Sequence, residues 1–245
     1  MPKLSVVALC FQEGPTAVRF ARRLEETLSS ARLDYEIIIV SNYISESDLT
    51  PGLVRKLAKE RERIRTITHR KEEGQGFGWD IREGLAKAKG DVIAFVDGDN
   101  QIPPEDVLLL YNKLQEDKLD LAKARRVERH DGTQRFLVTK VYNLIFHIFF
   151  PTVHDWDING KPKILTRAAY EKLSLTSNDW FIDAEIMIKA HQLGFKSGSV
   201  PTVFRKRPEG ASFLTLENGL ATIKNLIIYR FKPSNTPKPR KTRKT

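Results

Sequence analysis

The sequence predicts an α/β fold in which a mostly parallel central sheet is flanked by helices. Short apolar runs typical of buried strands alternate with segments whose apolar residues recur at helical spacing. Polar side chains follow several of these runs, as they do at the edge of a parallel sheet where strands lead into ligand-binding loops. With 245 residues and 40% hydrophobic content, the chain can build one large domain of this kind or two small ones.

The first part of the chain reads as a β-α-β-α-β unit. Leu24 and Leu28 lie at helical spacing, and Pro51 stands where proline favours the start of a helix. The expected strands are 4–11, 35–40 and 64–68, and the expected helices are 15–30 and about 50–62. The second strand ends at Ser41, Asn42 and Tyr43, so polar groups again follow a strand.

A fourth apolar run, 92–96, stops at two carboxylates, Asp97 and Asp99. Acids at this end of a strand face the crevice in which open α/β sheets bind ligands. Burying two unpartnered anions there costs roughly several kcal/mol, so a divalent cation is expected between them. The segment Asp-Gly-Asp-Asn also suits a plain turn, and by itself it does not separate the two interpretations.

A glycine-rich loop, 70–78, precedes the fourth strand and leads into an expected helix at 79–87. Backbone amides at such a helix start can hold a phosphate. The loop does not match the dinucleotide-binding fingerprint, because Trp79 stands where the third glycine is required. We therefore do not expect a classical NAD site. Another helix is expected from Pro103 to about Glu116.

The segment 118–150 combines positive charge with apolar character. An expected strand at 119–124 leads to Arg125, Arg126 and Arg129, and 118–140 holds seven basic residues against three acids. The next ten residues, 141–150, are almost wholly apolar or aromatic. This pairing suits a surface that meets anionic lipid head groups and inserts side chains among the lipids. A buried core helix is the alternative for 141–150.

The last third of the chain returns to polar chemistry. The loop 154–163 gathers acids, an amide and lysines, which suits phosphate handling. Thr166 is expected to cap a helix at 167–173. A further helix should start within 178–185 and end near Gly194. We expect a strand at 196–203 and a final helix at 214–229. Asp183 and Glu185 lie two residues apart, so they point to different faces of a helix and one of them is expected in the site.

Charge and composition limit where the protein acts. The net charge is +10, of which 232–245 supplies six basic residues and no acid, so about +4 belongs to the rest. We expect this tail to be disordered. The chain enters a strand directly after Met1 and shows no apolar run long enough for a membrane span, so we expect a cytoplasmic protein, peripheral on the cytoplasmic face of a membrane if it binds lipid. A single cysteine, Cys10, excludes an intramolecular disulfide.

Between about residues 4 and 212, the order and spacing of these motifs resemble family 2 glycosyltransferases of the GT-A fold. The resemblance is to the branch of dolichyl-phosphate mannose synthase and polyprenyl-phosphate glycosyltransferases. The matching segments are Phe11-Gln12-Glu13 (Y-N-E in the family), Gly76-Phe77-Gly78 with Gly84, Ala88 and Gly90 (G-x-G…G…A-x-G), Asp97-Gly98-Asp99-Asn100-Gln101 with Pro103-Pro104 (D-A-D-x-Q…P-P), Lys123-Ala124-Arg125 (G-S-R), 157–163 (D-P-x-S-G-F-R) and 207–212 (R-x-x-G-x-S).

This resemblance implies a single GT-A domain at 1–231, with a nucleotide-sugar half at 1–117 and an acceptor half of helices and loops at 118–231. It implies an inverting transfer of a hexose from a GDP- or UDP-linked donor to a polyprenyl or dolichyl phosphate. Asp97, Asp99 and Gln101 would hold Mg²⁺ or Mn²⁺ against the donor diphosphate. The other implied donor and acceptor contacts are Glu13, Asn42, Gly76, Arg125, Arg135, Lys140, Lys161, Lys163, Arg207 and Ser212.

Two departures from the family pattern bear on the substrates. Asn42 stands in Ser-Asn-Tyr-Ile where the family carries D-D-G-S, which leaves the donor base open, and Lys161-Pro162-Lys163 replaces G-F-R. The acceptor can therefore be a saccharide hydroxyl instead of a lipid phosphate. In that case a carboxylate must take the proton, and Asp157 and Asp183 are the candidates.

Two other classes of protein fit the sequence less well. A nucleotidyltransferase would need a G-G-x-G-T-R-like loop after the first strand, which the chain lacks. A nucleic-acid-binding protein would explain the basic tail, but it leaves Asp97, Asp99 and Gln101 without a role. No specific nucleic acid is expected as a partner.

Overall fold

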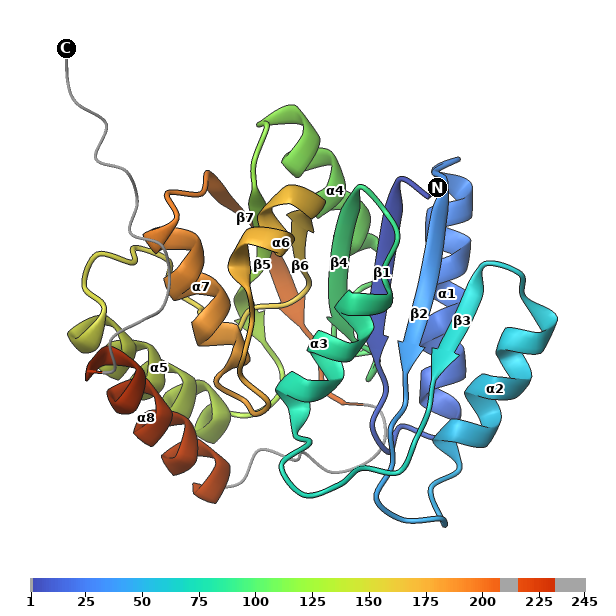
Figure 1. Ribbon diagram of the computed structural model, residues 1–245, viewed down its shortest axis with the longest axis horizontal. Helices are drawn as coiled ribbons and strands as arrows, with labels where there is room; N and C mark the ends of the chain where they lie inside the picture. The colour runs from blue at the N-terminus through green and yellow to red at the C-terminus, as the bar shows by residue number, and fades with distance from the viewer. Residues whose placement is uncertain (1, 208–215, 232–245) are drawn as a thin grey trace.

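The computed structural model describes residues 2–207 and 216–231, which form a seven-stranded sheet between two layers of helices (Figure 1). The sheet order is β3-β2-β1-β4-β6-β5-β7. Only β6 runs antiparallel to its neighbours β4 and β5 in this sheet. The strands are β1 (Leu4–Leu9), β2 (Tyr35–Val40), β3 (Ile64–Ile67), β4 (Val92–Asp97), β5 (Leu121–Arg129), β6 (Lys163–Thr166) and β7 (Ser197–Phe204).

Eight helices connect these strands within the described residues. They are α1 (Pro15–Ser30), α2 (Thr50–Glu60), α3 (Phe77–Lys87), α4 (Glu105–Glu116), α5 (Thr133–Phe149), α6 (Arg167–Leu173), α7 (Ile182–Gln192) and α8 (Leu216–Phe231). One core cluster joins α1, α2 and α4 to one face of the sheet, and a second joins α3, α5, α6, α7 and α8 to the other. The mixed α/β architecture with a mostly parallel sheet is the one that the sequence predicts.

The parallel half of the sheet forms where the apolar runs are continuous. Every residue of β1 and β2 is buried, as expected for strands that are covered by helices on both faces. Thr166 accepts a hydrogen bond from the amide of Ala169, so it caps α6 as predicted. The four-residue strand β6 was not expected, because its first residue is a lysine and the run is too short to show periodicity.

The apolar segment 141–150 forms the second half of α5, which starts at Thr133. Phe146 is buried, whereas Leu144 and Ile148 are exposed, so only one face of the helix packs as the core-helix interpretation requires. Within the residues described, no helix is long and apolar enough to span a membrane.

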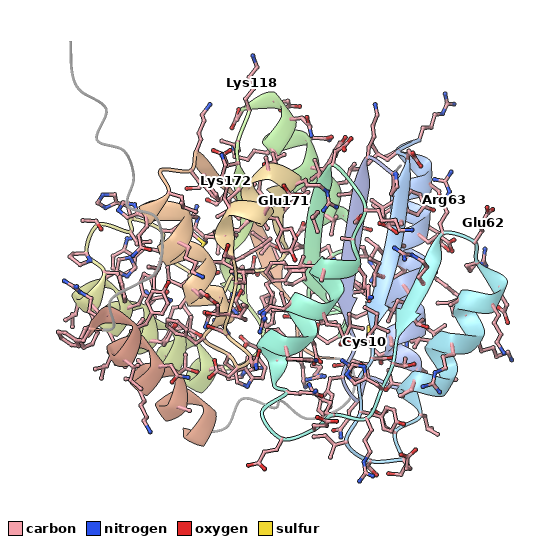
Figure 2. All side chains as sticks on the ribbon, in the orientation of Figure 1. Cys10, Glu62, Arg63, Lys118, Glu171 and Lys172 are labelled. Atoms are coloured by element: carbon pink, nitrogen blue, oxygen red, sulfur yellow. The ribbon has the colours of Figure 1, made fainter. Side chains whose placement is uncertain are left out.

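The two ends of the sheet differ in chemistry. Figure 2 shows Cys10 at the carboxyl end of β1, whereas Lys118, Glu171 and Lys172 lie at the opposite end of the molecule. Leu9 pairs with Asp97, so the carboxyl ends of β1 and β4 meet at the Cys10 end. Because β6 is antiparallel, it brings its first residue, Lys163, to this same edge, opposite Phe95.

Helix α3 packs so closely on the sheet that residue 84 must be glycine. A Cβ there would lie 2.3 Å from Val7 Cγ1 and 2.9 Å from Val40 Cγ2. We expect Gly84→Ala to lower the free energy of unfolding by about 1–3 kcal/mol through overpacking, measured by urea denaturation. Gly52→Ala in α2 is the control, because its Cβ meets nothing within 4 Å. It should leave stability unchanged or raise it by up to about 1 kcal/mol, and equal losses in both variants would contradict the packing argument.

Candidate active site

The turn after β4 places two carboxylates at the carboxyl edge of the sheet. Asp97 ends the strand, and the side chain of Asp99 accepts a hydrogen bond of 2.9 Å from the amide of Gln101. Between them, Gly98 donates to Leu9 O at 2.8 Å, and a Cβ on it would lie 2.3 Å from Cys10 Sγ. Glycine is therefore required for the turn to approach β1, and the buried Cys10 packs against it.

The electrostatics of this turn suit a bound cation. Burial, and then the negative charge of Asp97, raise the pKa of Asp99 to about 6. In residues 2–207 and 216–231, no three histidine, cysteine or acidic side chains gather into a metal-binding group. Two carboxylates completed by phosphate and water oxygens are, however, a typical donor set for Mg²⁺. The residues present therefore fit a divalent ion that binds together with a diphosphate.

Glu13 and Arg207 join the first loop to the end of the β7 segment. The guanidinium of Arg207 donates to the carboxylate of Glu13, and both side chains line the cavity next to Asp99. Burial raises the pKa of Glu13 to about 8, although the positive charge of Arg207 opposes the shift. The side-chain amide of Gln101 donates to Arg205 O at 2.9 Å and so anchors the turn after β4 to the same segment.

The glycine loop before α3 packs against the chain that leads into α7. A Cβ on Gly76 would lie 2.6 Å from Asn178 O, and the amide of Trp79 donates to that same oxygen. These contacts give Gly76 a packing role, and it also lines the cavity. The neighbouring Phe77 stacks on Trp180 with ring centroids 4.4 Å apart, which forms an aromatic wall.

Asn42 lies beneath the cavity and not in its lining. Its Nδ2 donates to Asp80 Oδ1 at 2.9 Å and to Glu83 Oε2 at 2.8 Å, and its Oδ1 accepts from the amide of His69. Asp80 does line the cavity and pairs with Lys71 at 2.6 Å. Asn42 thus positions Asp80, and its predicted contact with the donor base stays a prediction.

Two lysines share one buried carboxylate on α7. Lys161 Nζ lies 3.0 Å from Asp183 Oδ2 and 3.6 Å from Asp97 Oδ2, and Lys163 donates to Asp183 Oδ1. Burial would raise the pKa of Asp183, but the two ammonium groups outweigh it and lower the pKa to about 2. For the fully buried Lys163, burial prevails over Asp183 and lowers the pKa to about 8.

Glu185 points away from this cluster, as the two-residue spacing predicts. It accepts hydrogen bonds from the amides of Thr176 and Ser177 and pairs with Lys189 at 2.6 Å. Its role is to hold the segment before α7, and only Asp183 reaches the cavity.

A second set of ion pairs fixes the loop before β6. Lys123, which is fully buried, lies 2.9 Å from Asp155 and donates to Asp157 O at the same distance. Arg126 binds both carboxylate oxygens of Asp157 through its Nε, at 3.1 and 3.0 Å. Burial would raise the pKa of Asp157, but Arg126 holds it below its usual range. A carboxylate held in this way is a weak base.

A register shift in β5 selects which arginines face the cavity. Between Arg126 and Glu128 the pairing with β7 slips, which is the mark of a β-bulge. Strict alternation would put Arg126 and Arg129 on opposite faces, yet both line the cavity together with Arg135. Arg129 pairs with Asp131 at 3.0 Å and with Thr139 at 2.8 Å, and Arg135 lies 3.5 Å from Asp131.

The result is a cavity of about 330 Å³ at the carboxyl edge of the sheet, within the usual range for small-ligand sites. Carboxylates dominate the part around the end of β4, and arginines dominate the part around β5 and α5. Lys161 lies between the two parts.

The structure brings most of the predicted site residues together. The cavity lining includes Glu13, Gly76, Asp97, Asp99, Gln101, Arg135, Lys161, Asp183 and Arg207. Lys163 and Asp157 lie directly behind it, bonded to Asp183 and Arg126. Arg125 and Lys140 are exposed and outside the lining, and Ser212 and the tail 232–245 lie outside the described residues.

Sequence reasoning missed several cavity residues. Phe77, Trp180, Lys71 and Asp80 form the wall near α3, and their roles come from long-range contacts that no local pattern reveals. Arg126 and Arg129 were noted as basic, but the face they occupy depends on the bulge.

The sequence matches the model of the family described as Glycosyl transferase family 2 over residues 5–175. Glycosyltransferase AglD of Haloferax volcanii is 25% identical over 210 residues, which are 81% of this chain and 32% of that protein. The undecaprenyl-phosphate 4-deoxy-4-formamido-L-arabinose transferase of Salmonella choleraesuis is 28% identical over 144 residues, 58% of this chain and 42% of that protein. The chain spans less than half the length of these two curated relatives.

Among solved structures, the fold is similar to glucosyl-3-phosphoglycerate synthase from Mycobacterium tuberculosis in complex with Mn²⁺, uridine diphosphate and phosphoglyceric acid. The TM-score is 0.66 at 19% identity, with 96% of this chain and 80% of that chain covered. The likeness confirms the GT-A fold that the motifs imply.

Asp183 is expected to be essential for stability. Asp183→Asn leaves Lys161 and Lys163 buried without their shared anion, so the free energy of unfolding at pH 7 should fall by about 3–5 kcal/mol, measured by chemical denaturation. The folded pKa of about 2 lies below the ordinary value of about 4. The stabilisation is therefore complete above pH 4 and is lost as the pH falls through 2.

The matched control is Asp117→Asn, because Asp117 pairs with Lys113 at 2.8 Å on the surface. It should leave stability at pH 7 unchanged. If Asp183→Asn unfolded with the same midpoint as the wild type, the buried pairing would not support the fold.

Proposed function

Because this chain belongs to glycosyl transferase family 2, we propose that it moves a sugar from a nucleotide sugar to the phosphate of a polyprenyl lipid, with a divalent metal. The observation that carries this proposal is the division of the cavity into a carboxylate part and an arginine part. A metal-bound leaving group suits the first, and an anionic acceptor suits the second.

The carboxylate part supports a donor diphosphate. Asp97, Asp99 and the Gln101 amide would hold Mg²⁺ or Mn²⁺, which supplies Lewis-acid neutralisation of the departing nucleoside diphosphate. Arg207 donates to Glu13, and its positive charge also acts on the nearby Asp99. Its guanidinium can pair with two phosphate oxygens. Phe77 and Trp180 offer an apolar wall and exclude water from one side.

The arginine part supports an acceptor phosphate. Arg126, Arg129 and Arg135 line the cavity within one stretch of β5 and α5, and Thr139 adds a hydroxyl. Planar guanidinium groups bind phosphate through paired hydrogen bonds, which gives orientation as well as charge. A phosphate oxygen that attacks the anomeric carbon in line would invert it, and the bond to the diphosphate would break.

The two carboxylates that the sequence offers as bases for a saccharide hydroxyl, Asp157 and Asp183, suit that role poorly. A hydroxyl must lose its proton during the attack, which requires a base with a pKa near the working pH. Lys161 and Lys163 hold the pKa of Asp183 at about 2, and Arg126 holds the pKa of Asp157 below its usual range. A phosphate is already ionised at pH 7 and needs no such base.

The proposal is tested by incubating the protein and Mn²⁺ with radiolabelled UDP- and GDP-sugars and either polyprenyl phosphate or saccharide acceptors. Label should pass to the lipid fraction. Transfer to a saccharide and not to polyprenyl phosphate would overturn the lipid acceptor. No transfer with any donor would overturn the proposal as a whole.

Asp99→Ala should abolish metal-dependent donor binding without unfolding the protein. Removing one of two neighbouring acids relieves repulsion, but it also takes away a ligand for the cation. Calorimetry with Mn²⁺ and the nucleotide sugar that supports transfer should therefore detect no binding. Glu62→Ala changes an exposed acid that Figure 2 shows well apart from Cys10, a residue of the cavity lining, and it should bind as the wild type does. Unchanged affinity in Asp99→Ala would refute the metal assignment.

Arg135→Ala should weaken the use of polyprenyl phosphate about 10- to 100-fold, mainly through KM, because one charge-assisted hydrogen bond is worth roughly 1.5–3 kcal/mol. Donor affinity should not change. The matched control is Arg125→Ala, at a neighbouring arginine that is exposed and outside the cavity lining. If Arg125→Ala lost as much activity as Arg135→Ala, the acceptor phosphate would bind elsewhere.

A further inference from the structure

Helix α5 exposes apolar side chains at helical spacing on its outer face. Leu137, Val141, Leu144 and Ile148 follow one another by four, three and four residues, and their exposed fractions are 63, 48, 56 and 66%. The opposite side of the helix packs on the protein through Phe146. The apolar stripe is therefore not the face that builds the core.

The inner face of α5 carries core side chains such as Phe146 and one buried polar residue. Asn143 is buried, accepts a hydrogen bond from the amide of Ile158 and donates to Thr139 O. A surface helix normally places its polar residues in water and its apolar ones in the core. Helix α5 is instead apolar on its outer face as well as on its inner face, and an exposed apolar stripe of this kind is typical of a surface that contacts a partner or a membrane.

Helix α8 extends the same surface. It lies beside α5 at one end of the molecule, away from α2 (Figure 1). Its exposed apolar residues, Ile227, Ile228 and Phe231, lie in its last turns, and the last of them is 74% exposed. We call the apolar stripe of α5 together with the exposed apolar residues of α8 the α5–α8 surface; its residues are Leu137, Val141, Leu144, Ile148, Ile227, Ile228 and Phe231.

The charged residues of these helices are basic, with the exception of Glu217 near the start of α8. Lys140, Lys224 and Arg230 are exposed, and α5 contains no acidic residue. Lys140 Nζ lies 5.0 Å from the centre of the Phe136 ring, so its stem covers apolar surface while its charge faces outward. The sequence directly after Phe231 adds six basic residues and no acid. Apolar side chains among cations complement an anionic bilayer and not an acidic protein surface alone.

We propose that the α5–α8 surface docks on an anionic phospholipid bilayer and inserts its apolar side chains at the level of the head groups. Arg135 and Thr139, on the inner side of α5, line the cavity. A lipid phosphate leaving the bilayer would therefore meet the arginine part of the cavity after passing a single helix. This last step rests on the proposed function, whereas the docking itself does not.

The test is flotation of the full chain with vesicles of phosphatidylcholine alone or mixed with phosphatidylglycerol. The wild type should float with the anionic vesicles and much less at high salt. Leu144→Glu with Ile148→Glu should weaken vesicle binding more than tenfold. The matched control is Leu49→Glu with Leu109→Glu, at two exposed leucines outside this surface, one directly before α2 and one on α4. It should bind as the wild type does, and the thermal unfolding of both variants checks that they fold.

Three results would overturn the docking surface. The first is that the wild type floats with neither kind of vesicle. The second is that the control variant loses vesicle binding as much as the α5 variant does. The third is that vesicles fail to bind and sedimentation shows a dimer of the wild type and of the control variant but a monomer of the α5 variant. The last result would make the surface an interface between two copies.

Transfer to a short-chain polyprenyl phosphate in buffer without vesicles separates this inference from the proposed function. Leu144→Glu with Ile148→Glu should leave that transfer unchanged. Normal transfer without flotation would overturn the docking surface alone. Flotation as expected without any transfer would leave the surface standing and overturn the proposed function.

Discussion

The shared carboxylate of Asp183 is the interaction on which the geometry of the cavity depends. It joins three parts of the chain, since Lys161 comes from the loop before β6, Lys163 begins that strand, and Asp183 lies in the first turn of α7. An isolated ammonium buried in this position would cost several kcal/mol, roughly, so the strand can begin with a lysine only where α7 supplies the anion. The same contact holds the Lys161 side chain beside Asp97.

The charges around the cavity are paired before any ligand arrives. Arg126 is held by Asp157, Arg129 by Asp131, and Lys71 by Asp80. Each cation is thus fixed in place without a large excess of positive charge, which orients the donors and limits nonspecific attraction of anions. Substrate phosphates would compete with these carboxylates or add to the remaining donors of the same guanidinium groups.

The sequence was most informative where a pattern is local and repeated. Continuous apolar runs predicted β1, β2 and β4, the acids after β4 indicated the edge of the sheet at which the cavity lies, and Thr166 indicated the start of α6. It was least informative where one position depends on a distant one. The lysine that begins β6 requires an anion that lies twenty residues later in the chain, on α7. Which of Arg125 and Arg126 faces the cavity likewise depends on contacts with distant parts of the chain.

The bulge in β5 determines how many arginine side chains face the cavity. With one residue more on its side of the ladder than β7 has, β5 turns both Arg126 and Arg129 inward. If the same residues paired with β7 in an unbroken register, Arg126 and Arg129 would fall on opposite faces of the sheet and only one of them would reach the cavity. Substrate preference among related chains can therefore change through the register of two strands, with no change in the residues that an alignment of motifs would compare.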